Sequence, residues 1–154
     1  MDPVHFHLIT NHIPILGSNF SLVLLIIGML IKNRTVEIVA LATLVTVAFA
    51  TIPVYLSGEE AEHTVEHMQG ISEYELEEHE EHAETTLWLM IAAGLLGSMA
   101  LVSYKYSPDY TKWARLATVA VLFFTFLSMI PLALHGGEII RSEIRGDAPA
   151  EHDD

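Results

Sequence analysis

The sequence predicts an all-α integral membrane protein, a four-helix bundle made of two helical hairpins with a short acidic helical cap on its outer face. Hydrophobic residues make up 51% of the chain, and the mean hydropathy is +0.40 although the net charge is −13. The charged residues must therefore be segregated from the apolar ones. Four apolar segments, each close to the ~20 residues that a helix needs to cross a bilayer, are separated by short polar stretches.

The four predicted spans cover residues 13–31, 36–56, 87–104 and 113–134. Glu37 and Arg115 are their only charged residues, and each lies near the end of its span. A buried helix of a soluble protein would carry a polar stripe, which these segments lack. We expect residues 1–145 to form one membrane domain and residues 146–154 to form an acidic, disordered tail.

The connections between the spans predict the topology. Tight turns at 32–35 and 105–112 close the two hairpins, so both turns lie on one side of the membrane. That side carries five basic and two acidic residues, whereas the other side carries two basic and eighteen acidic residues. Basic short loops mark the cytoplasmic side. The sequence therefore predicts a multi-pass protein of the bacterial inner (cytoplasmic) membrane with both termini on the periplasmic, outer side.

Residues 57–85 form the predicted cap between the hairpins. This stretch holds eleven of the twenty acidic residues and four of the nine histidines, with no Lys or Arg. Ser57 is placed to cap a short helix that Gly70 would end. Ser72 and Glu75 form a capping box for a second helix, which should continue into the third span.

The cap has two interpretations. Charge runs on exposed helices are often only solvated surface. Imidazoles and carboxylates at helical spacing also bind metal ions, and the cap offers His63 with His67 and His79 with His82. Glu62 and Glu80 stand beside these histidines as further ligands or as partners that orient them.

All nine histidines fall on the predicted outer side. His12 stands at the threshold of the first span, where an imidazole needs a partner such as a metal or a carboxylate. His7 lies five residues earlier, and His135 closes the fourth span before Gly136 and Gly137. Glycines allow close approach by a bulky group. We favour His12 with His79 as the central pair and His7 as the next candidate.

A faint repeat aligns residues 52–60 with residues 130–138, in each case at the outer end of a hairpin's second helix. Parallel repeats of this kind occur in membrane transporters. Pro14, Pro53 and Pro131 would lie at a similar depth. Either all three kink their helices and open the bundle outward, or Pro14 is an early-turn proline and only two helices bend.

Four short motifs carry a resemblance to known proteins: HLITNHIP at 7–14, SGEEAEH at 57–63, HE at 79–80 and GGEIIR at 136–141. With them the chain, from residue 7 to about residue 144, resembles a bacterial family of small four-span membrane proteins classed as a domain of unknown function. Relatives joined to or encoded near Rieske and cytochrome proteins imply redox work. The family positions that the resemblance carries over are His7, Asn11, His12, Glu59, Glu62, Glu66, His79, Glu80, Gly136, Gly137 and Arg141.

Two functions of different classes follow. The first is electron transfer through a b-type haem held by two of His7, His12, His79 and His135, with a quinone or a periplasmic cytochrome as partner. The second is a non-haem site for Zn, Fe, Cu or Mn, used for catalysis, sensing or ion delivery. Its candidate ligands are His7, His12, Glu62, His63, His79, Glu80 and His82.

A third interpretation is a structural subunit of a membrane complex. The expected partners are the lipid bilayer and, through assembly, a second copy of the chain or a larger complex. We expect no nucleic-acid partner for a chain with a net charge of −13.

Overall fold

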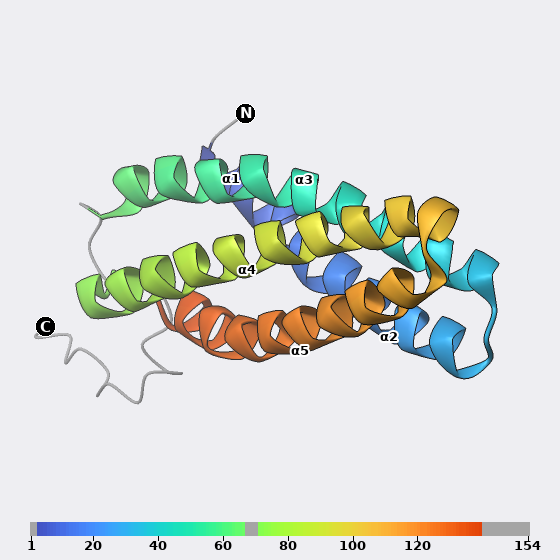
Figure 1. Cartoon of the computed structure of the whole chain (residues 1–154). Coiled ribbons are helices and arrows are strands. Elements are labelled where there is room, and N and C mark those ends of the chain that lie inside the picture. The colour runs from blue at the N-terminus through green and yellow to red at the C-terminus, as the bar shows by residue number, and fades with distance from the viewer. Residues whose placement is uncertain (1–2, 67–70, 140–154) are drawn as a thin grey trace, which may run out of the picture.

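The computed structural model describes residues 3–66 and 71–139, and these residues are helical except at short connections. The helices are α1 (Pro3–Thr10), α2 (His12–Leu30), α3 (Arg34–Val65), α4 (Glu73–Tyr106) and α5 (Pro108–Glu138). Helices α1 and α2 together, and each of the other three, are long and apolar enough to cross a membrane. The predicted all-α four-helix architecture is confirmed (Figure 1).

The helices are longer than the spans. Helix α3 has 32 residues, which at 1.5 Å per residue gives a length of roughly 48 Å, whereas a bilayer core is about 30 Å thick. Both tight turns lie at one end of the bundle, which we call the inner end (Figure 1). The end of α3, the start of α4 and the end of α5 lie at the opposite, outer end. The acidic segments of α3 and α4 are therefore continuations of membrane helices.

The cap is built differently from its prediction. The Ser57 hydroxyl donates to the Val54 carbonyl at 2.7 Å within α3, which continues to Val65, so no separate helix starts at Ser57. One glycine such as Gly58 costs a helix only about 1 kcal/mol, and α3 buries Ala61 and Val65 beyond it. The predicted helix end at Gly70 lies outside the described residues. The predicted cap of α4 is present, because the Ser72 hydroxyl accepts from the Glu75 N–H at 3.3 Å.

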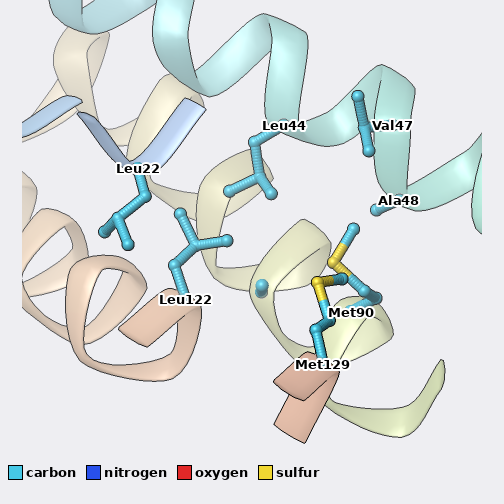
Figure 2. Packing of buried hydrophobic residues seen from close by; sticks show 8 residues of the cluster. Leu22, Leu44, Val47, Ala48, Met90, Leu122 and Met129 are labelled. Carbon is cyan, nitrogen blue, oxygen red and sulfur yellow. The ribbon is translucent and has the colours of Figure 1, made fainter. Parts of the chain in front are cut away.

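All four spans meet in the core. Figure 2 shows Leu22 of α2, Leu44 of α3, Met90 of α4 and Leu122 of α5 packed together. Small residues bring the helices close: a Cβ built on Gly17 would lie 2.5 Å from the Val47 side chain, and one on Gly94 would lie 2.6 Å from Ala48. Close approach at small residues replaces the hydrophobic driving force that is absent between helices in lipid.

The inner end contains a buried polar network. The Glu37 carboxylate of α3 accepts from the Tyr104 hydroxyl of α4 and from the Arg115 guanidinium of α5. Glu37 is 3% exposed, so its charge is compensated inside the protein rather than by water. Because Glu37 and Arg115 neutralise each other, the surface of the inner end keeps the net basic character that the topology prediction uses.

Of the three prolines, only Pro53 and Pro131 lie inside helices, in α3 and α5. Pro14 is the third residue of α2, after a break at Asn11. An early-turn position costs a helix no hydrogen bond. The structure therefore agrees with the alternative in which two helices, not three, carry an interior proline.

Candidate functional site

Two histidines at the outer end are fixed in the same way. The Nδ1 atom of His7, on α1, lies 3.2 Å from the Val54 carbonyl oxygen of α3. The Nδ1 atom of His79, on α4, lies 3.0 Å from the Leu132 carbonyl oxygen of α5. A carbonyl oxygen only accepts, so Nδ1 carries the proton in both rings. The neutral tautomer then leaves a lone pair on Nε2, which can bind a metal.

The faint sequence repeat corresponds to this arrangement. Each accepting carbonyl directly follows an interior proline, Pro53 or Pro131, and lies four residues before a glycine, Gly58 or Gly136. A Cβ on Gly58 would lie 3.0 Å from Cε1 of His7, and one on Gly136 would lie 2.8 Å from Cε1 of His79. Gly58 thus leaves the space in which the imidazole of His7 rests, and Gly136 does the same for His79.

Both imidazoles line a cavity of about 670 Å³ at the outer end. Its walls are largely apolar and come from all of the helices, with Leu8, Ile15, Val54, Leu87, Met129 and Leu132 among the lining residues. His12 and Asn11 line the same cavity. A second cavity of about 140 Å³ is also lined by His7 and His79, together with Glu59, Glu62 and Glu80. The volume of the larger cavity lies within the range of pockets that hold cofactors.

The surroundings favour uncharged rings. Burial lowers the pKa of His7, and the hydrogen bond to Val54 opposes this effect. Burial also lowers the pKa of His79; the Leu132 hydrogen bond opposes it, and the nearby His7, His135 and His82 lower it further. At neutral pH both side chains are therefore neutral, which is the form that binds a metal.

Asn11 adds an unpaired acceptor to this cavity. Its Oδ1 atom is shielded from solvent and has no hydrogen-bond partner among the described residues. Buried polar atoms nearly always have a partner, so a donor from a water or a ligand in the cavity is expected there.

A second group of ligand-capable side chains lies between α4 and α5. The Nδ1 atom of His135 is 2.7 Å from a Glu75 carboxylate oxygen, and the rings of His82 and His135 stack with centroids 5.4 Å apart. Two sets of residues that could hold a metal ion share His135. They are Glu78, His82 and His135, and Glu75, His135 and Glu138, with the ligand atoms of each set within 4.8 Å of one another.

The predicted site residues therefore separate into groups. His7, His12 and His79 meet at the larger cavity, while Glu62 and Glu80 line the smaller one. His135 and His82 belong to the α4–α5 group instead. His63 is exposed on α3 and lines neither cavity. His67 and Arg141 lie outside the described residues.

Sequence reasoning did not single out Glu75, Glu78 and Glu138 as ligands. A signal was present, because residues 75, 78 and 82 recur at helical spacing on one face of α4, as do residues 135 and 138 on α5. The pairing of these two faces depends on how α4 packs against α5, which spacing alone does not give.

Comparison with protein-family models, with curated proteins and with solved structures found no match to this chain. The geometry of the two sites is therefore the basis for the functional argument.

Proposed function

We propose that the protein is a membrane electron-transfer protein that would hold a b-type haem in the larger outer cavity through His7 and His79. One observation carries the proposal. Two neutral imidazoles from different hairpins line one apolar cavity, and a backbone carbonyl fixes the Nδ1 atom of each. That hydrogen bond sets the tautomer and orients the ring, as protein partners of metal-ligating histidines commonly do.

Two imidazoles, those of His7 and His79, suit a haem better than they suit a non-haem metal ion. A non-haem ion at His7 and His79 would need further ligands at short range, and neither set of clustered ligand atoms among the described residues includes these two histidines. A haem supplies four nitrogen ligands of its own and needs only two axial ligands and apolar walls. The iron of a bound haem would supply one-electron redox chemistry.

The charge of the outer end affects how such a cofactor binds. The described Lys and Arg residues, Lys32, Arg34, Lys105, Lys112 and Arg115, all belong to the inner end. Glu59, Glu62 and Glu80 line the smaller cavity beside the proposed haem site, so ionised haem propionates would be repelled there. Because salt screens such repulsion, we expect haem binding to tighten as the ionic strength increases.

The charges of the two ends also bear on the location of the protein and on its redox partners. The basic inner end predicts a bacterial inner membrane protein with the haem near the periplasmic face. An acidic outer end would attract basic redox proteins such as periplasmic cytochromes, and a quinol in the bilayer is the alternative electron donor. Because both ligand histidines contact carbonyls near the outer ends of the spans, Val54 and Leu132, the haem would lie close to water-soluble partners.

Titration of the purified, detergent-solubilised protein with haem tests the proposal through the Soret band of bound haem. We expect saturation at one haem per chain, with at least about tenfold weaker binding for His7→Ala and for His79→Ala. His63→Ala is the matched control, because His63 is an exposed histidine of the same acidic end that lines neither cavity. Equal losses in all three variants, or wild-type affinity in the first two, would contradict the assignment.

A further inference from the structure

The outer ends of α4 and α5 present five ligand-capable side chains to one another. Helix α4 contributes Glu75, Glu78 and His82, and α5 contributes His135 and Glu138. The spacing of i, i+3 and i+7 places the three α4 residues on one face, and i, i+3 does the same for the two α5 residues. Metal sites of helical bundles are built from such carboxylate and imidazole pairs on facing helices.

Glu75 is the most buried carboxylate of this group and has a hydrogen bond to His135. This residue is 9% exposed although it is a carboxylate in the first turn of α4. Its carboxylate accepts from Nδ1–H of His135 at 2.7 Å. A carboxylate in this position fixes the His135 ring and leaves Nε2 available, the arrangement in which carboxylates support metal-binding histidines.

Glu75 and Glu78 stand at i and i+3 on α4, where like charges repel each other, so positive charge nearby stabilises this pair. In the part of the chain that the structure describes, every Lys and Arg belongs to the inner end. The two histidines are therefore the only described side chains of the group that can become positive. A divalent cation between the two helices would offset the repulsion between Glu75 and Glu78.

The geometry points to a divalent transition-metal site, of the class that Zn²⁺ fills, formed by Glu78, His82 and His135 with Glu75 and Glu138 beside them. Mixed nitrogen and oxygen ligands match Zn²⁺, Fe²⁺ and Mn²⁺, whereas Ca²⁺ and Mg²⁺ prefer oxygen alone. This site is separate from the proposed haem site, since neither His7 nor His79 belongs to it. Its ion would tie the start of α4 to the end of α5, next to Gly136 in the cavity wall.

The site is tested with full-length protein in detergent, first treated with a chelator and then titrated with Zn²⁺ in a calorimeter, and with Co²⁺ as an optical probe. We expect one Zn²⁺ per chain and at least about tenfold weaker binding in Glu78→Gln and in His82→Ala. The side chains of these two residues are about a third exposed, so their removal leaves no buried partner unpaired. We also expect visible absorption bands of bound Co²⁺ that His82→Ala abolishes.

Two control variants distinguish this site from diffuse binding of the ion by the acidic surface and from binding in the haem cavity. His63→Ala removes an exposed histidine from the neighbouring acidic helix, and His79→Ala removes a proposed haem ligand; both should bind Zn²⁺ as the wild type does. If His63→Ala weakens binding as much as His82→Ala does, the ion is held only by diffuse negative charge. If His79→Ala abolishes binding, the ion lies in the cavity. Wild-type affinity in Glu78→Gln and His82→Ala would likewise overturn the inference.

Discussion

Replacing Gly136 by alanine should displace His79 without disturbing the rest of the bundle. The added Cβ would lie 2.8 Å from Cε1 and 2.9 Å from Nδ1 of His79, whereas ordinary contacts begin at 3.4 Å. The ring must therefore retreat by about 0.6 Å, which is the difference between 3.4 and 2.8 Å. Such a shift strains or breaks the hydrogen bond to Leu132, worth about 1 kcal/mol, and misdirects Nε2.

Gly137→Ala is the control, because a Cβ at this neighbouring glycine meets nothing within 4 Å. Alanine is favoured over glycine inside a helix by up to about 1 kcal/mol, so this variant should keep or slightly raise the free energy of unfolding. In Gly136→Ala the same gain offsets the lost hydrogen bond, and the free energy of unfolding should change by less than about 1 kcal/mol.

Haem affinity is where the two variants should differ. Spectroscopic haem titration should give at least about tenfold weaker binding for Gly136→Ala and wild-type binding for Gly137→Ala. Thermal unfolding of both apoproteins, measured by circular dichroism, shows whether the fold is retained. Wild-type haem affinity in Gly136→Ala, or an equal loss in Gly137→Ala, would refute the argument that the glycine makes room for the ligand ring.

Three further predictions concern the fold and its surface. Glu37→Ala should lower the free energy of unfolding by about 3 kcal/mol, because it leaves the Arg115 charge without its buried partner. The control Asp109→Asn, at an exposed acidic residue, should change the free energy of unfolding by less than about 0.5 kcal/mol. Equal effects of the two variants in denaturant titrations would contradict this prediction. The chain has no cysteine, so single cysteines introduced at Asn33 and Thr64 report the topology directly. An impermeant thiol reagent added outside cells should label only Thr64→Cys. Labelling of Asn33→Cys alone would mean that the topology is inverted. Burial and the nearby Glu80 carboxylate raise the pKa of Glu62 above its ordinary 4.5. The folded state therefore binds a proton at Glu62 more tightly than the unfolded state does, and it gains stability as pH falls through the raised pKa. Glu62→Gln should therefore stabilise the apoprotein by roughly 0.5 kcal/mol at pH 7 but not at pH 4, and an equal effect at both pH values would argue against the repulsion.

Much of the fold could be predicted from the sequence because apolar length and charge placement are local properties. The four helices that are long and apolar enough to cross a membrane and the Ser72 cap both depend on such signals. The structure of the cap was harder to predict. Ser57 has the type and position of a helix cap, but packing of Ala61 and Val65 keeps α3 helical beyond it.

The site was predicted only in outline. The clustering of histidines at the outer end follows from the topology, but the partner of each ring depends on how the helices pack. The sequence favours His12 over His7, and only the contact with Val54 distinguishes His7 as the better oriented ring. The repeat at Pro53 and Pro131 was visible in the sequence. Only the tertiary structure shows that this repeat places a carbonyl and a glycine beside each imidazole.

Low-temperature electron paramagnetic resonance of the oxidised, haem-reconstituted protein tests the central claim most directly. Two imidazole ligands make ferric haem low-spin, and the loss of either ligand leaves a high-spin iron. The wild type and the His12→Ala variant should therefore give a low-spin signal, whereas His7→Ala and His79→Ala should each give a high-spin signal. A wild type without bound haem, a low-spin signal in either ligand variant, or conversion to high spin in His12→Ala would contradict the assignment of His7 and His79.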